Sequence, residues 1–342
     1  MNVKLNILFI MKIISVFFLF ILQISCNDLA KKQYQKFEGL ALGTVFHITY
    51  DPSEYEIAEN EIDSLLHLVN KSMSTYIPNS NISKINSGDT TIIVDELFVE
   101  VFNKSDRIYK ETDGYFDPTI GIIVNAWGFG PKGQLEAVDT TQIQTMLTFV
   151  GFNNVKIENG IVQKKFIKTY IDFNAIAKGF AVDVIGRYLE HRNIDNYLIE
   201  IGGEIRARGV NSSSNPWTIA IEKPNFDGSR SFQSVIELSN ESIATSGNYR
   251  KFKIDSLTGE KYAHTMDPKT GFPSKSNLLS ASVISEKDCA DVDAYATALM
   301  SMGLEKSKEF LRNYPDLKAF LIFSEDDGQI KTYTTKNLNL KN

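Results

Sequence analysis

The stretch NYLIEIGGEIRARGV, residues 196–210, lies in the middle of the chain and predicts β-structure, because branched apolar side chains alternate with polar ones along much of it. WTIAIEKP (217–224) and SVIELSN (234–240) continue the same kind of pattern. A hairpin is expected around DSLTGEKY (255–262). The middle third of the chain is therefore expected to consist mostly of strands.

Towards the N-terminus, strand-like and helical patterns follow one another. TVFHITY (44–50) alternates like a half-buried strand, and EIAENEIDSLLHLVNKSMSTY (56–76) has apolar residues near helical spacing. Further helices are expected over 95–111 and from 139 to 151. A hairpin over 154–165 is expected to turn on Asn159 and Gly160.

The remaining segments also alternate between the two types. KTYIDF (168–173) is typical of a strand that passes directly into a helix, NAIAKGFAVDVIGRYLEHR (174–192). LLSASVIS (278–285) predicts a strand before the helix DCADVDAYATALMSMG (288–303), which another helix and two closing strands follow. Because hairpins alternate with helices over 37–337, we predict one α+β domain with a largely antiparallel sheet.

The glycine-rich stretch WGFGPKG, residues 127–133, contains a literal G-x-G-x-x-G. A Rossmann fingerprint needs a strand before it and a helix that opens on its last glycine. Pro131 and Lys132 interrupt any helical continuation here, so the match does not indicate a Rossmann fold. Trp127 and Phe129 can instead face a planar ligand from a loop, and burial in the core is the competing interpretation for both rings.

The first 25 residues have a short basic start and a long apolar run, which predicts a signal peptide. Cys26 follows directly, and this arrangement resembles a bacterial lipoprotein site at which that cysteine becomes lipidated. A retained transmembrane anchor is the alternative, since the run approaches the roughly 20 residues of a spanning helix. In either case we expect a polar tether over 26–36 and attachment to a membrane.

Charge and cysteine content limit the partners of the mature chain. The formal charge of the whole chain is −6, and removal of residues 1–25 takes away two lysines and no acid, which leaves −8. Nucleic acid is therefore not an expected partner. An anionic ligand must be held by local groups, such as a metal, a few cations or backbone N–H groups. The chain has two cysteines, and lipidation of Cys26 leaves Cys289 without a disulfide partner.

The junction DFNAIAKGF, residues 172–180, is a candidate phosphate site. The backbone N–H groups at the start of a helix point outward and favour an anion. Lys178 falls in the first turn of the predicted helix, on the side away from Ile176 and Phe180, and can add a cation. Taken by itself, the junction is better explained by a surface lysine and a packing glycine at Gly179.

The segment DVDAYATAL is a candidate metal site. Asp293 and Thr297 are four residues apart on a predicted helix, so their oxygens share one face. A carboxylate and a hydroxyl suit Mg²⁺ when a phosphate and waters complete its six ligands. The alternative is that Thr297 bonds to its own helix and that Asp293 is only a first-turn acid.

His264 is a candidate acid–base residue because it lies in KYAHTMDPKTGFP, between a predicted strand and a turn. Hydroxyl side chains at Thr245, Ser246 and Thr265 are its expected neighbours. A histidine in such surroundings can bond a phosphate or accept a proton.

Taken together, these stretches give the sequence a close resemblance to the ApbE family of FAD:protein FMN transferases. The matching motifs include ALGTVFHI, DGYFDPTIGIIVNAWGFGP, DFNAIAKGFAVD, AHTMDPKTGFP and ADVDAYATALMSMG, and they cover nearly the whole mature chain. The resemblance implies an enzyme tethered to the inner membrane at its periplasmic face. Such an enzyme splits FAD, attaches FMN to a Thr or Ser of a target protein through a phosphoester, and releases AMP. It also implies that the targets are flavin-carrying subunits of membrane redox complexes, such as Na⁺-translocating quinone reductase (Nqr) and Rnf.

The resemblance also implies the site residues. The Mg²⁺ ligands are expected to be the backbone oxygen of Ala175 and the side chains of Asp293 and Thr297, with Asp291 as a reserve and Mn²⁺ as a possible substitute for Mg²⁺. His264 is expected to orient the phosphates or to accept the hydroxyl proton. The expected FAD contacts are Leu42, Tyr76, Trp127, Gly128, Phe129, Asp172, Lys178 and His264. Leu42 stands where the family often has Met.

Two other functions use the same residues. In a metal-dependent FAD pyrophosphatase, water replaces the acceptor hydroxyl. In a flavin-storing lipoprotein, FAD is bound and not turned over.

Overall fold

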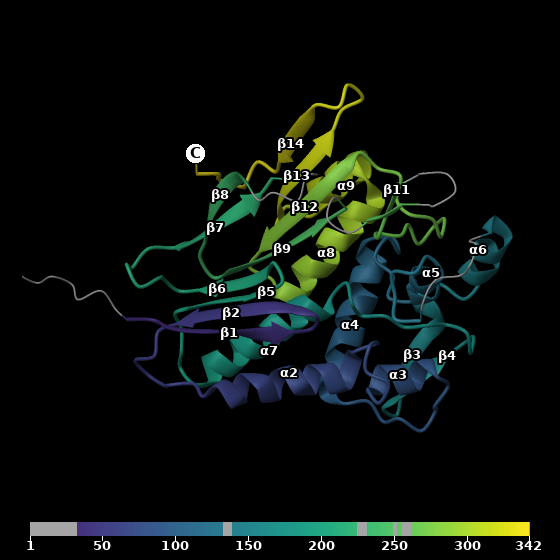
Figure 1. The fold of residues 1–342 in the computed structure, drawn as a ribbon, viewed down its shortest axis with the longest axis horizontal. Coiled ribbons are helices and arrows are strands. Elements are labelled where there is room, and N and C mark those ends of the chain that lie inside the picture. The colour runs from purple at the N-terminus through teal and green to yellow at the C-terminus, as the bar shows by residue number, and fades with distance from the viewer. Residues whose placement is uncertain (1–32, 133–138, 224–230, 249–251, 255–260, 342) are drawn as a thin grey trace, which may run out of the picture. The chain divides into compact units, whose positions relative to one another are not determined.

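An eight-stranded sheet forms the centre of the fold, and every pair of neighbouring strands in it is antiparallel (Figure 1). The computed structural model describes residues 33–132, 139–223, 231–248, 252–254 and 261–341. In spatial order the strands are β1 (Gln35–Ala41), β2 (Thr44–Tyr50), β5 (Tyr197–Ile201), β6 (Glu204–Arg208), β9 (Glu241–Gly247), β12 (Leu278–Ser285), β13 (Lys318–Ser324) and β14 (Ile330–Thr334).

Two helices pack directly on one face of this sheet. They are α7 (Ala177–His191), which contacts β5 and β6, and α8 (Cys289–Met302), which contacts β9 and β12. Two further helices, α2 (Glu59–Met73) and α4 (Glu96–Glu111), pack against α7 and α8 as a second layer (Figure 1). Another helix, α9 (Leu304–Asn313), follows α8 and contacts β13.

The two faces of the sheet contribute to two separate hydrophobic clusters. In β13, Leu321 belongs to the large cluster on the helical side, whereas Phe320 and Ile322 belong to a smaller one. The hairpin formed by β7 (Trp217–Glu222) and β8 (Phe232–Leu238) covers that smaller cluster. This division follows from the alternation of side chains along a strand.

The remaining elements are short. They are α3 (Asn81–Asn86), α5 (Gly121–Ala126), α6 (Thr140–Leu147), the 3₁₀ turn Phe152–Asn154, and the strand pairs β3 (Val155–Glu158) with β4 (Ile161–Lys164) and β10 (Phe252–Ile254) with β11 (Lys261–Ala263). A third hydrophobic cluster joins α5 and α6 to Trp127 and Met266.

The predicted fold class, α+β with a largely antiparallel sheet, is confirmed. The predicted strand KTYIDF is wrong, because Tyr170 makes only an isolated bridge with Ile120 and the segment joins no sheet. The predicted helix that starts at Asp139 is shorter than expected and ends at Leu147. Strand β1 was not predicted, and it begins at Gln35, within the range 26–36 expected for the tether.

The expected signal peptide and Cys26 lie outside the described residues. Within the part of the chain that the structure describes, no helix combines the length and the apolar character needed to cross a membrane.

Candidate functional site

The start of α8 is fixed by a carboxylate from α7. The carboxylate of Asp183 is fully buried and accepts hydrogen bonds from the backbone N–H groups of Cys289 and Ala290, both at 2.8 Å. It therefore satisfies donors that a helix start otherwise leaves unpaired. Arg206 of β6 pairs with the same carboxylate at 2.8 Å. These contacts tie α7, α8 and the sheet together, and the thiol of Cys289 is buried among them.

One turn further along α8, Asp293 points at the start of α7. Its Oδ2 atom accepts a hydrogen bond from the backbone N–H of Gly179 at 3.1 Å, and its side chain is almost completely buried. Burial raises the pKa of Asp293, while the Lys178 ammonium and the Gly179 N–H oppose this rise. The predicted phosphate junction and the predicted metal-binding aspartate are therefore in direct contact.

The other two predicted metal ligands leave oxygen lone pairs available. Ala175 lies in the turn before α7, and none of the described residues donates a backbone hydrogen bond to its carbonyl oxygen. The hydroxyl of Thr297 lies 3.2 Å from the hydroxyl of Ser246 on β9. In the described part of the chain, no group of three or more His, Cys, Asp or Glu side chains is arranged to hold a metal. A carbonyl, a carboxylate and a hydroxyl are nevertheless hard oxygen donors of the kind that suits Mg²⁺.

Asp291, the reserve ligand, is engaged elsewhere. Its carboxylate pairs with Arg107 at 2.7 Å and with Lys104 at 3.3 Å, both from α4. Two buried aspartates, two residues apart on α8, thus have different surroundings. Asp291 joins two helices, whereas Asp293 contacts the start of α7.

Glu204 was missed by the sequence analysis. It is the first residue of β6, is 2% exposed, and forms an ion pair with Lys178. Burial raises the pKa of Glu204, and the nearby Lys178 opposes this rise. Although burial would lower the pKa of Lys178, the carboxylates of Glu204 and Asp293 raise it overall. The only sign of this buried ion pair in the sequence was the position of an acidic residue, Glu204, directly after Gly202 and Gly203.

Asp172 and Tyr76 lie next to the same junction. Asp172 accepts a hydrogen bond from the backbone N–H of Asn174 at 2.8 Å, which fixes the turn that leads into α7. Burial raises the pKa of Asp172 to about 6. Burial and the charge of Asp172 raise the pKa of Tyr76, whose ring is nevertheless 60% exposed. An exposed ring at this position can cover a bound ligand.

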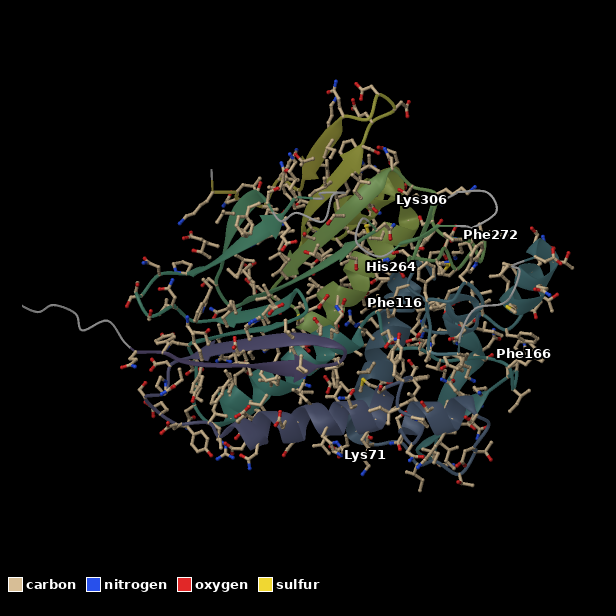
Figure 2. All side chains as sticks on the ribbon, in the orientation of Figure 1. Lys71, Phe116, Phe166, His264, Phe272 and Lys306 are labelled. Carbon is tan, nitrogen blue, oxygen red and sulfur yellow. The ribbon has the colours of Figure 1, made fainter. Side chains whose placement is uncertain are left out.

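The aromatic loop that follows α5 packs against the segment after His264. Trp127 is buried and donates a hydrogen bond from Nε1 to the Gly271 carbonyl at 3.0 Å, so its ring is part of a core cluster. The Phe129 ring lies 6.4 Å from the His264 ring, centre to centre. Figure 2 labels His264 and also Phe272, whose ring contacts Trp127 edge-on. Gly128, with φ +75°, allows the turn between the two aromatic residues.

Leu42 occupies the tip of the β1–β2 hairpin. Leu42 and Gly43 both have positive φ, at 47° and 77°, as a two-residue type I′ turn requires. A leucine is strained in this conformation by about 1–2 kcal/mol. The adjacent Thr44 packs against Gly202, so this tip lies beside the β5–β6 turn that leads to Glu204.

Two further sets of contacts connect the segments that carry these site residues. Thr265 donates a hydrogen bond to Asn248, which directly follows β9, the strand of Ser246. Asp172 and Tyr170 pack closely against Gly121, at the start of the helix that leads to Trp127. The predicted metal ligands and ligand contacts, spread over 250 positions of sequence from Leu42 to Thr297, are thus connected through a few shared neighbours.

The chain is similar to known flavin transferases over most of its length. The ApbE family model matches residues 42–321. An FAD:protein FMN transferase from Vibrio cholerae is 37% identical over 307 residues, which cover 87% of this chain and 90% of that protein. An FAD:protein FMN transferase from Haemophilus influenzae is also 37% identical, over 85% of this chain and 86% of that protein.

Solved structures agree with this similarity. The flavin transferase ApbE from Vibrio cholerae superposes with a TM-score of 0.79 at 34% identity, over 89% of this chain and 97% of that one. The flavinyl transferase ApbE from Pseudomonas stutzeri superposes with a TM-score of 0.78 at 28% identity, over 90% and 97% of the two chains. The chain described here belongs to the ApbE family.

Proposed function

We propose that this protein transfers FMN from FAD to a Thr or Ser hydroxyl of a target flavoprotein subunit, that it releases AMP, and that the reaction depends on Mg²⁺. Its relatives at up to 37% identity are FAD:protein FMN transferases, which supports an enzyme of this class. The contact between Asp293 and the start of α7 is the main support for this site. There the Gly179 N–H donates a hydrogen bond to the Asp293 carboxylate, and the Lys178 ammonium lies near the same carboxylate.

The residues fit a metal-assisted diphosphate site. The oxygens of Ala175, Asp293 and Thr297 would hold the ion. Bound Mg²⁺ withdraws charge from the diphosphate and stabilises the AMP leaving group. Lys178 supplies a further positive charge, and its ion pair with Glu204 limits the positions its ammonium can take.

The chain's own groups then orient the reaction. The acceptor hydroxyl oxygen bonds to the FMN-side phosphorus, the bond from that phosphorus to the bridging oxygen breaks, and AMP leaves with that oxygen. His264, held beside Phe129, accepts the hydroxyl proton or orients the phosphates. We assign contacts with FAD to Leu42, Tyr76, Asp172, Gly128 and Phe129. Since Trp127 is buried, we assign its role to fixing the loop and the Gly271 turn.

Partners and location are part of the same proposal. We infer that the acceptors are flavin-carrying subunits of the Nqr or Rnf type. The sequence of residues 1–26 supports attachment to the membrane through a lipid on Cys26, at the periplasmic face.

The test is to incubate the purified protein with FAD, Mg²⁺ and a soluble flavin-carrying domain of a quinone reductase subunit. Flavin that remains on the acceptor through denaturing electrophoresis, with an equal amount of AMP, is the expected result. AMP without labelled acceptor would indicate FAD hydrolysis, and bound FAD without AMP would indicate storage.

A matched pair of variants tests the metal assignment. Thr297→Val should raise the Mg²⁺ or Mn²⁺ concentration needed for half-maximal transfer, because it removes a proposed ligand. Thr245→Val removes a neighbouring hydroxyl, which lies 2.7 Å from Ser282, and should leave the metal requirement unchanged. Equal metal requirements in the two variants would refute the assignment of Thr297.

A further inference from the structure

A hairpin directly follows His264 in the chain. Ser274 donates its backbone N–H to the Thr265 carbonyl at 2.9 Å, and Met266 bridges Pro273. We call residues 265–274 the 265–274 hairpin. One side of it contacts Trp127 through Gly271 and Phe272. Five of its residues also line a pocket: Asp267, Thr270, Phe272, Pro273 and Ser274.

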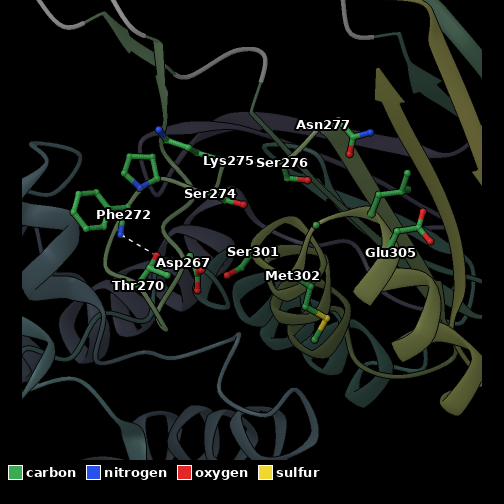
Figure 3. Close-up of a pocket in the computed structure, with 13 residues that line it drawn as sticks. Asp267, Thr270, Phe272, Ser274, Lys275, Ser276, Asn277, Ser301, Met302 and Glu305 are labelled. Carbon is green, nitrogen blue, oxygen red and sulfur yellow. Dashed lines mark hydrogen bonds between the residues drawn. The ribbon is translucent and has the colours of Figure 1, made fainter. Parts of the chain in front are cut away.

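The pocket has a volume of about 680 Å³ and lies between the 265–274 hairpin, the end of α8 and the start of α9 (Figure 3). Such a volume is within the range of ligand sites, roughly 300–1,000 Å³. Its lining includes Thr270, Phe272, Ser274, Ser276, Ser301 and Glu305. None of the residues assigned above to FAD or to the metal is among the lining residues.

The pocket continues the face of α8 that carries the proposed metal ligands. Asp293, Thr297 and Ser301 follow one another at steps of four, so they lie along one side of the helix. Ser301 is therefore about 6 Å along the axis from Thr297. Its hydroxyl donates to the Met266 carbonyl at 3.3 Å, two residues after His264. The pocket thus adjoins both the proposed metal ligands and the proposed proton acceptor.

The chemistry of the lining favours a peptide over a nucleotide. Its charged members are two acids, Asp267 and Glu305, and one lysine, Lys275, so the net charge does not attract an anion. Serine, threonine and asparagine side chains supply both donors and acceptors, and Phe272, Pro273 and Met302 add apolar surface. This mixture of groups suits the alternating amides and small side chains of a polypeptide.

We propose that this pocket holds the segment of the acceptor protein that flanks the accepting hydroxyl. The inference rests on the proposed function, because FMN transfer requires a macromolecule to place one hydroxyl at the reacting phosphate. A segment in the pocket sits one helical turn from Thr297 and beside the 265–274 hairpin. Its adjoining residue can then reach the diphosphate without displacing FAD.

Two exposed positions on opposite walls allow the pocket to be blocked. Glu305→Trp fills it from α9, and Thr270→Trp fills it from the 265–274 hairpin. The matched control is Glu309→Trp, since Glu309 is an exposed glutamate four residues later on α9 and does not line the pocket. Each variant is assayed with the soluble flavin-carrying domain of a quinone reductase subunit as acceptor, and FAD affinity is measured without acceptor.

Both pocket variants should raise KM for the acceptor by about tenfold or more, which corresponds to the loss of one good contact. FAD affinity should stay at the wild-type value, and Glu309→Trp should behave as wild type. An unchanged acceptor KM in both pocket variants, or an equal loss of FAD affinity, would overturn the pocket assignment alone. Failure of the wild-type protein to label any acceptor would overturn the proposed function instead.

Discussion

The close approach of α7 and α8 at Gly179 gives the sharpest prediction. A Cβ atom at this position would lie 2.6 Å from the carbonyl carbon of Cys289 and 2.8 Å from the nitrogen of Ala290. Both are backbone atoms and cannot rotate away. To bring the carbonyl carbon from 2.6 Å to an ordinary contact of 3.4 Å, the helices must separate by at least 0.8 Å in Gly179→Ala, and the Cys289 carbonyl oxygen, which lies closer still, requires more.

Two opposing terms set the expected size of the effect. Overpacking costs about 1–3 kcal/mol, and the upper end applies because the obstacle is backbone. Alanine returns about 1 kcal/mol of helix propensity. The free energy of unfolding should therefore fall by about 2 kcal/mol, which lowers Tm by roughly 4–8 °C in a domain of this size class. A shift approaching 1 Å between Asp293 and the start of α7 should also slow transfer by up to about 100-fold.

The assay combines thermal unfolding with single-turnover FMN transfer at saturating FAD and Mg²⁺. Gly186→Ala is the control, because it lies in the same helix and its Cβ would meet only side-chain atoms of Arg206 and Tyr197. Because Arg206 is held by ion pairs and Tyr197 is buried, we expect the control to lose some stability through overpacking, but to keep the transfer rate because no backbone atom beside Asp293 has to move. If Gly179→Ala matched the wild type in both Tm and rate, the argument that this contact sets the site geometry would be refuted.

Three more predictions concern single side chains. Asp293→Asn should abolish Mg²⁺-dependent transfer with little change in Tm. Asp291→Asn should instead lower Tm, because it weakens the pairs with Lys104 and Arg107, and it should keep the metal dependence. The opposite pattern would exchange the roles of the two aspartates. His264→Ala should reduce the transfer rate at saturating FAD, and a normal rate would remove it from catalysis. Burial raises the pKa of Asp117 from 3.8 to about 6. Between about pH 4 and 6 the folded chain therefore holds a proton that the unfolded chain releases, so the free energy of unfolding should fall as the pH rises through this range. Asp117→Asn should reduce this slope in denaturant titrations, and an unchanged slope would contradict the assignment.

The sequence was most informative where a short segment determines its own structure. Asp95, the first residue of the predicted helix 95–111, caps the observed helix Glu96–Glu111 by accepting the N–H of Phe98 at 2.9 Å. Asn159 and Gly160 both have positive φ, as the hairpin prediction required. In each case neighbouring residues contain the physical cause, so the pattern can be read locally.

The sequence was least informative where distant segments meet. KTYIDF has strand-like composition, but the Asp172 N–H bonds to the Pro118 carbonyl, and among the described residues none of the named strands includes this segment. The pairing of Glu204 with Lys178 depends on a hairpin turn and a helix start that approach only in the folded chain. The polar pocket beside α9 is equally invisible in the sequence, since its walls come from separate loops and helices.

The buried thiol of Cys289 has a practical consequence. Burial raises the pKa of this thiol well above its ordinary value, and its sulfur contacts the Ile205 carbonyl at 3.5 Å. A soluble alkylating reagent can reach this sulfur only after α8 separates from the elements that cover it, among them β6. The rate of modification at this sulfur, followed by mass spectrometry, therefore reports how often α8, the helix that carries Asp293, opens under native conditions.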